Sequence, residues 1–128
     1  MNKASSIKLL NAFPQLYRGF QKSLHASVIS DFECNDGWFQ ILWDLSAALE
    51  AEALKEGRDQ TNWPQAIQIK EKYGSLRFYM DHASPAMWDL VQAGEEKSGL
   101  VCEMCGEPGK TYNDSWINTS CNSCRPIP

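Results

Sequence analysis

The sequence lacks the motifs that usually assign an enzymatic activity. It contains no glycine-rich phosphate-binding loop, no GxSxG nucleophile turn and no HExxH pair of metal-binding histidines. Histidine is scarce, because only His25 and His82 occur in the chain. Either could pair with Cys34 and be oriented by Asp36 or Asp81, but no spacing in the sequence requires such a pair. We therefore expect a protein that is not an enzyme, with a Cys34-dependent enzyme as an alternative.

Long apolar runs are also missing. No stretch of about eighteen apolar residues is present, so we expect no membrane-spanning helix and no membrane partner. The N-terminal stretch is basic, but Lys8, Asn11 and Pro14 interrupt any signal-peptide core. These features predict a cytoplasmic protein, in a compartment where thiols stay reduced.

The chain does contain enough apolar residues to build a hydrophobic core. Of its 128 residues, 43% are hydrophobic and 11% are aromatic, which excludes a disordered chain. This length fits one domain, or one domain with a small appended module.

Four of the cysteines lie in the last quarter of the chain. Cys102 and Cys105 form one CxxC pair, Cys121 and Cys124 form another, and fifteen residues separate the pairs. This spacing is typical of zinc sites in which two tight turns supply four tetrahedral sulfur ligands. Gly106 follows the first pair, where such a turn often needs a positive φ. The pattern predicts a closed, structural Zn²⁺ site; two disulfides or a redox CxxC motif are the alternatives.

The segment between the two pairs is expected to form a zinc ribbon. Residues 110–112 and 116–119 flank a polar turn and predict two short strands that carry one pair to the other. The ribbon has only Lys110 and Arg125 as basic residues in a chain of net charge −4. Because Zn²⁺ with four thiolates adds negative charge, and phosphate binding rests on Lys and Arg, DNA binding through the ribbon is disfavoured.

The first 30 residues predict a basic helical segment without acidic residues. Its basic residues are Lys3, Lys8, Arg18 and Lys22. Ser5 or Ser6 is the expected cap of a first helix over residues 7–12, and Pro14 is expected in the first turn of a second helix. The apolar residues at helical spacing in the second helix are Leu16, Tyr17, Phe20 and Leu24.

Two further helices are expected, over about residues 37–56 and 85–98. Asp36 is the expected cap of the longer helix and Gly57 its end. Ser84 and Pro85 give the other helix a clear start. The apolar stripes are Trp38, Leu42, Leu45 and Leu49 in the first of these helices, and Met87, Trp88, Leu90 and Val91 in the second.

Between these helices the hydrophobic pattern alternates, which predicts a β-hairpin over residues 66–81 with Gly74 in its turn. The residues expected to face the longer helix are Leu76, Phe78 and Met80. The basic residues of the hairpin are Lys70, Lys72 and Arg77, with Tyr73 and Tyr79 nearby. Because basic and aromatic side chains together can hold single-stranded nucleic acid, nucleic-acid binding is an alternative function. It would use this hairpin surface together with the basic residues of the N-terminal helices.

Four stretches of the chain resemble a known family. They are residues 33–38, 69–79, 102–109 and 116–121, and the resemblance spans about residues 32–124. The family consists of small, uncharacterised proteins of tailed bacteriophages and bacterial prophages. It has no assigned activity that could be carried over to this chain.

The metal-binding motif departs from that family at one end. Members often close with a Cys-x-x-His pair, where this chain has Cys121 and Cys124. Either pair can ligate zinc, so the metal prediction is unchanged. The resemblance implies an accessory protein that acts on a host or phage component, with inhibition of a bacterial defence system as a candidate role.

Taken together, the sequence predicts an α+β fold in which helices pack on a small antiparallel sheet. We expect a basic helical segment at 1–30, an α+β core at 31–99 and a zinc ribbon docked on the core at 100–128. The expected function is binding of a protein partner, whose identity the sequence does not give. Any exposed tryptophan would be a candidate anchor for that partner; those considered are Trp43, Trp63, Trp88 and Trp116.

Overall fold

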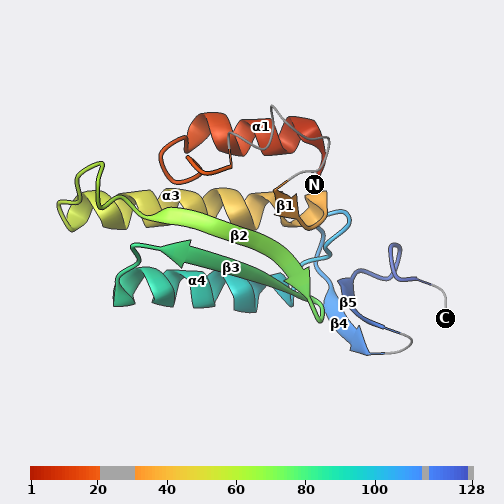
Figure 1. Cartoon of the computed structure of the whole chain (residues 1–128). Coiled ribbons are helices and arrows are strands. Elements are labelled where there is room, and N and C mark those ends of the chain that lie inside the picture. Colours follow the sequence, from red (N-terminus) through yellow and green to blue (C-terminus); the bar gives the residue numbers. More distant parts are fainter. Residues whose placement is uncertain (21–30, 114–115, 127–128) are drawn as a thin grey trace.

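The computed structural model describes residues 1–20, 31–113 and 116–126. Its helices are α1 (Lys3–Ala12), the 3₁₀ helix η1 (Asp36–Trp38), α3 (Phe39–Lys55) and α4 (Pro85–Ser98). Its strands are β1 (Phe32–Glu33), β2 (Gln65–Lys72), β3 (Ser75–Asp81), β4 (Lys110–Asn113) and β5 (Ile117–Ser120). Helix α3 lies between α1 and α4, and the β4–β5 pair sits at one end of the molecule (Figure 1). The predicted α+β class is confirmed.

The predicted hairpin is strands β2 and β3, which pair antiparallel. Lys72 pairs with Ser75, so the turn consists of Tyr73 and Gly74 alone, with φ of 54° and 81°. Two successive positive φ values define a tight turn whose twist matches that of the strands, and glycine is the natural residue at one of them. The turn was therefore correctly predicted from Gly74.

The main sheet contains the predicted antiparallel pair and, in addition, a parallel pair that was not predicted. Strand β1 pairs parallel with β2, placing Phe32 opposite Ile69 and Glu33 opposite Lys70. The sequence of residues 31–37 indicated only a connector, because a strand of two residues is too short to show an alternating pattern. The order β1-β2-β3 puts the chain entering α3 beside the middle of β2.

Asp36 does not cap the long helix as predicted. It is the first residue of η1, and its carboxylate accepts hydrogen bonds from the backbone N–H and the side-chain amide of Asn2, at 2.8 and 2.9 Å. The Asp36 carboxylate therefore stabilises the start of α1. This contact between distant residues takes the place of the predicted cap on the long helix. The predicted end of the helix is confirmed, since Gly57 follows it with φ of 71°.

The N-terminal segment is only partly helical in the described region. Helix α1 is capped by Asn2, whose side chain accepts from the Ser5 amide, and not by Ser5 or Ser6. The predicted second helix is wrong for residues 14–20, which form turns; residues 21–30, including Leu24, lie outside the described residues. The reason is a long-range contact, because the Leu16 carbonyl accepts from the Ala66 amide at 2.9 Å and draws this segment along β2.

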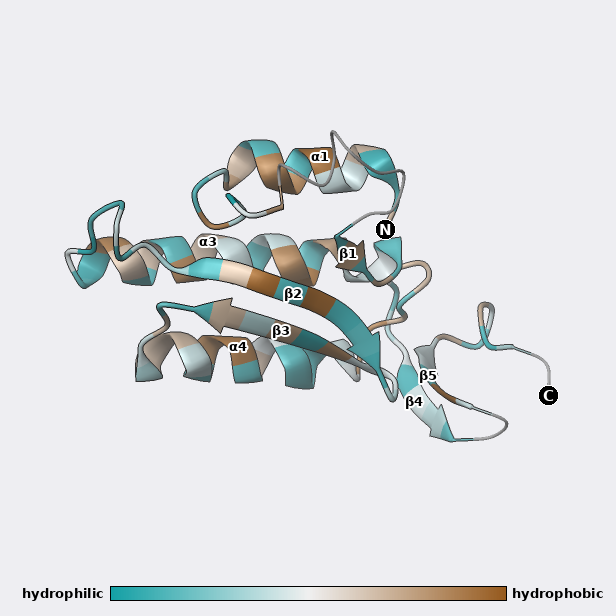
Figure 2. Cartoon of the chain, in the orientation of Figure 1, coloured by the Kyte–Doolittle hydropathy of each residue, from teal (hydrophilic) through white to brown (hydrophobic). Residues whose placement is uncertain are grey.

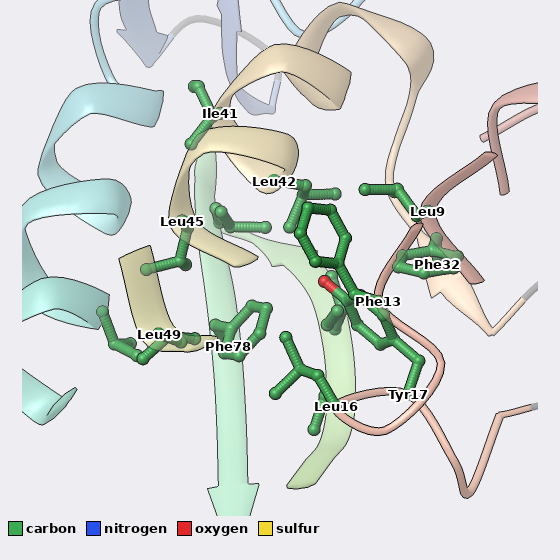
Figure 3. Packing of buried hydrophobic residues seen from close by; sticks show 14 of the residues in the cluster. Leu9, Phe13, Leu16, Tyr17, Phe32, Ile41, Leu42, Leu45, Leu49 and Phe78 are labelled. Atoms are coloured by element: carbon green, nitrogen blue, oxygen red, sulfur yellow. The ribbon is translucent and has the colours of Figure 1, made fainter. Parts of the chain in front are cut away.

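One hydrophobic cluster unites the N-terminal segment, α3, α4 and the sheet. Leu16 and Tyr17 are as deeply buried as Leu42 and Leu49 of α3. Figure 3 shows these side chains in one packed cluster together with Phe78 of β3. Hydrophobic residues recur along α3 and β2, whereas β4 is largely hydrophilic (Figure 2). The buried hydrophobic side chains of residues 9–20 therefore pack into the same core as those of the later elements.

Replacement of Tyr17 by phenylalanine is expected to lower the free energy of unfolding by about 1 kcal/mol. The Tyr17 hydroxyl is buried 2.6 Å from Ser46 Oγ, and burial raises the pKa of this tyrosine well above its usual range. Ser46 also donates to the Leu42 carbonyl, so it keeps one partner in the variant. Urea unfolding would measure the loss, with the exposed Tyr79→Phe as control. Equal stability of Tyr17→Phe and wild type would contradict the hydrogen bond.

Helix α4 begins at Ser84 and Pro85 as predicted, with the Ser84 hydroxyl accepting from the Met87 amide. Its buried stripe is narrower than predicted, since Met87 and Val91 are buried but Trp88 is 43% exposed. No helix among the described residues is long and apolar enough to span a membrane.

Helix α4 also covers the outer edge of β3. The Leu76 amide donates to Ser98 Oγ, and the Phe78 amide donates to the Glu95 carboxylate, each at 2.9 Å. Exposed strand edges offer unpaired backbone groups to other chains. Two side chains of α4 satisfy those groups within the molecule.

Candidate metal centre

The four C-terminal cysteines converge on one point. All four Sγ atoms lie within 4.8 Å of one another, and those of Cys105 and Cys121 are 3.7 Å apart. Zinc–sulfur bonds of about 2.3 Å in a tetrahedron separate the sulfurs by about 3.8 Å, whereas a disulfide bond is about 2.05 Å long. All five cysteines of the chain are free thiols. The four residues are positioned to coordinate a metal ion and form no disulfide.

Local backbone geometry builds the first turn of the site. The Cys102 carbonyl accepts from the Gly106 amide at 2.9 Å, and the Cys102 amide donates to the Glu107 carbonyl at 2.7 Å. Gly106 has φ of 84°, which confirms the predicted left-handed residue after the first pair. The antiparallel strands β4 and β5 then bring the second pair back to the first, as the flanking residues predicted.

The thiols differ in their electrostatic surroundings. Burial raises the pKa of Cys102, but hydrogen bonds from the backbone amides of Cys121, Cys105 and Met104 outweigh it and lower the pKa to about 7. Hydrogen bonds among the thiols, chiefly from Cys121 and then Cys105, raise the pKa of Cys124 to about 12. Cys102 is therefore the thiol most ready to bind a metal as thiolate.

The pKa of Cys105 is raised as well. The hydrogen bond from the Glu107 amide lowers this pKa. Partial desolvation and hydrogen bonds with the Cys102 and Cys121 thiols raise it, and together they have the larger effect. Metal-free protein thus holds protons at Cys105 and Cys124 that a metal ion must displace.

Metal binding is expected to release at least two protons per ion near about pH 8, from Cys105 and Cys124. Because the metal binds thiolates and must displace the thiol protons, its apparent affinity is highest above the thiol pKa values and falls progressively as the pH decreases below them. Each unit of decrease should weaken binding about a hundredfold or more. Zn²⁺ titration of reduced metal-free protein, in weakly buffered solution and across pH, would measure both quantities. An affinity independent of pH would contradict thiolate coordination.

The cysteine-bearing ribbon (residues 100–126, described apart from 114–115) contacts the core at the start of η1. The Gly37 amide donates to the Glu103 carbonyl at 2.7 Å. The Glu103 carboxylate accepts from the Asn35 amide and side chain, at 3.0 and 3.1 Å. Trp38 Nε1 donates to the Val101 carbonyl at 2.9 Å. No sequence spacing links these residues, because about 65 positions separate the two sides.

A second contact joins the ribbon to the tip of the β2–β3 hairpin. The buried Thr119 hydroxyl donates to the Gly74 carbonyl and lies 2.7 Å from the Thr111 hydroxyl. A Cβ on Gly74 would stand 3.1 Å from methyl groups of both Ile117 and Thr111. The metal site is therefore held between two parts of the core that lie far apart in sequence.

The basic residues of the hairpin share one face of the sheet. Lys70 is paired with Arg77 across β2 and β3, and Lys72 follows two residues later on the same side. The Lys70 ammonium lies 6.0 Å from the Tyr79 ring centre, and that of Lys72 lies 5.5 Å from the Tyr73 ring centre. The structure thus brings these predicted residues together.

Cys34 and the histidines are not brought together in the described residues. Cys34 is 5% exposed, and burial raises the pKa of its thiol to about 12, so it stays protonated at neutral pH. His82 follows Asp81, which pairs with Gln65 at the start of β2. Cys34 follows Glu33, which pairs with Lys70 near the end of β2. Gln65 and Lys70 are about 16 Å apart along the strand, so Cys34 and His82 lie beside different ends of β2. His25 lies outside the described residues.

Two of the candidate tryptophans are exposed. Trp88 on α4 and Trp116 before β5 are 43% and 55% exposed. Trp43 and Trp63 pack partly buried against the core, and Trp63 Nε1 donates to the Glu50 carboxylate at 3.0 Å. Only Trp88 and Trp116 therefore stay available as partner anchors.

Fold and site together define an α+β protein with a four-cysteine site suited to a metal ion. Comparison of the chain with protein-family models, with curated proteins and with solved structures finds no match.

Proposed function

We propose that the four-cysteine site holds a structural Zn²⁺ ion. The convergence of four sulfurs supports this, because Cys102, Cys105, Cys121 and Cys124 would fill a tetrahedral shell and leave no position for substrate. Zinc bound there would supply folding energy to the ribbon.

The metal can be identified directly, because four thiolates also suit iron. Elemental analysis of the purified protein should give one zinc per chain, and the protein should be colourless. Substitution of bound zinc by Co²⁺ should produce the intense visible bands of tetrahedral thiolate coordination. Iron at one equivalent per chain, or no metal in protein purified under reducing conditions, would contradict the proposal.

We further propose that the protein binds a protein partner and acts through that contact. The observation that carries this proposal is Trp116, a large apolar side chain that is 55% exposed on the ribbon. Tryptophan at a surface is a frequent source of binding energy once it is covered. The setting we propose is the one implied by the family resemblance, an accessory protein of a phage or prophage that acts on a host component, with inhibition of host defence as a candidate outcome.

The partner proposal is tested by affinity capture from bacterial lysate, with nuclease treatment in parallel. We expect a discrete protein that survives nuclease, is retained by Trp88→Ala and is lost with Trp116→Ala. Trp88→Ala is a matched control because it removes an indole of similar exposure from α4. Loss of every partner on nuclease treatment would contradict the proposal.

Nucleic-acid binding is a second candidate, favoured by the shared face of Lys70, Lys72 and Arg77. Phosphate contacts make affinity fall steeply with salt, and each contact removed lowers the slope of log affinity against log salt by about 1. Binding of single-stranded DNA or RNA to the wild type, compared with Lys70→Ala and Arg77→Ala across salt, tests it. Absence of binding at low salt would exclude this function.

A further inference from the structure

An open groove lies where the ribbon meets the core. It has a volume of 980 Å³ and is lined by Met1 and by residues from β1 and its flank, from the hairpin tip and from the ribbon. Its walls thus come from four parts of the chain, and the two ribbon contacts hold the last three of them together. Among the lining residues, the ones that give the groove its chemical character are Glu33, Glu71, Tyr73, Glu103 and Trp116.

The groove is acidic. Glu33, Glu71 and Glu103 face it, and within the described part of the chain none of them forms an ion pair. No lysine or arginine is among the described residues that line it. Among them the cationic group is the Met1 amine, which donates to the carbonyls of Phe32 and Cys34.

The neighbouring lysines do not neutralise these carboxylates by direct contact. Lys70 stands opposite Glu33 in the strand register without an ion pair, and Lys72 lies over the Tyr73 ring. Two carboxylates are fixed by backbone amides, because Glu71 accepts from Gly74 at 2.8 Å and Glu103 accepts from Asn35 at 3.0 Å. Their positions are set before any ligand arrives, which lowers the entropic penalty of binding.

Two exposed aromatic side chains complete the groove. Tyr73 is 67% exposed at the hairpin tip, and Trp116 is 55% exposed on the ribbon. Aromatic rings stack on arginine and attract cations over their faces. Carboxylates beside exposed rings are thus complementary to a segment that carries both cationic and apolar atoms.

We propose that this groove binds a basic, arginine-containing segment of the protein partner. The inference rests on the proposed partner-binding function and deepens it by assigning the surface and the chemistry of the partner. A phosphate backbone is disfavoured there, because three carboxylates would repel it.

The test uses a ten-residue peptide with three arginines spaced by glycine and leucine. The control peptide carries citrulline, the neutral isostere of arginine, at the same three positions. Each is titrated at low salt into zinc-loaded, ¹⁵N-labelled full-length protein and followed by amide and indole NMR shifts. Titration of Ca²⁺ in parallel shows whether the carboxylates hold a metal ion instead.

We expect the arginine peptide to bind about tenfold or more tightly than the citrulline peptide, with shifts centred on Tyr73, Trp116 and Ile117. Glu33→Gln should weaken binding about threefold and Trp116→Ala about tenfold. Asp89→Asn and Trp88→Ala, matched changes on the exposed face of α4, should leave it unchanged. The Glu33 side chain makes no hydrogen bond within the described residues, so its replacement should not disturb the fold.

Equal binding of the two peptides, shifts located elsewhere, or saturation by Ca²⁺ alone would overturn the groove proposal. Such results are distinguishable from failure of the proposed function. If affinity capture retains a protein partner with Glu33→Gln and Trp116→Ala combined, the partner proposal stands and the groove is wrong. If no protein partner is captured at all, the partner proposal itself fails.

Discussion

Replacing Cys102 with serine is expected to abolish stoichiometric metal binding and to unfold the ribbon. Cys102 is fully buried, and its sulfur accepts hydrogen bonds from backbone amides of both CxxC turns. The ribbon has a short, largely hydrophilic β4–β5 pair and little core of its own. Small zinc modules draw about 10–16 kcal/mol of folding free energy from the metal, so loss of one ligand should lower stability by more than about 3 kcal/mol.

Elemental analysis and urea unfolding, monitored by tryptophan fluorescence, would measure the effect. Cys34→Ala is the matched control, because it removes a buried thiol outside the site and should leave one metal per chain. The Cys34→Ala replacement should lower the free energy of unfolding by only about 1 kcal/mol, because it removes little side-chain volume. A Cys102→Ser protein with native stability and full metal content would show that the four-cysteine site is not a structural centre.

Gly37→Ala is expected to destabilise the protein by about 3 kcal/mol or more, because it forces the ribbon away from the core. A Cβ on Gly37 would lie 2.1 Å from the Cys102 carbonyl oxygen and 2.5 Å from the Glu103 carbonyl carbon. These are backbone atoms of the first metal-binding turn, so they cannot move aside as a flexible side chain could. The hydrogen bond from the Gly37 amide to Glu103 would be strained at the same time.

Gly57→Ala provides the comparison for this prediction. Gly57 has φ of 71°, but a Cβ there would meet nothing within 4 Å. The Gly57→Ala replacement should therefore lower the free energy of unfolding by only about 1 kcal/mol, which is the penalty for placing alanine in the left-handed backbone region. Thermal unfolding of both variants gives the difference. Equal losses would mean that the close approach of Gly37 to the ribbon does not support the fold.

The metal site could be predicted because the residues that form it follow one another closely in the sequence. The two CxxC turns, Gly106 and the flanking strands each follow from neighbouring residues, and the structure brings the four sulfurs together as the spacing indicated. The hairpin and α4 were predicted for the same reason. Gly74 marks a tight turn, and Ser84 with Pro85 marks a helix start.

The remaining features depend on contacts between distant residues. Residues 14–20 have a helical pattern, yet the Ala66 amide binds the Leu16 carbonyl and the segment forms turns. Asp36 has the character of a helix cap but binds Asn2. Strand β1 has only two residues, and the groove needs residues from four separate segments. Local preference is weak beside such tertiary contacts, so pattern alone could not reveal them.

The hydrogen bonds from Leu76 and Phe78 to α4 limit the ways in which another protein can attach. Many peptide-recognition domains bind by β-augmentation, in which a partner segment is added as a further strand through main-chain hydrogen bonds. Here Ser98 and Glu95 already occupy those two amides of β3, so a partner strand would have to displace them. A partner that meets this edge of β3 should therefore be recognised through side chains, and the specificity of that contact should respond to single substitutions in the partner.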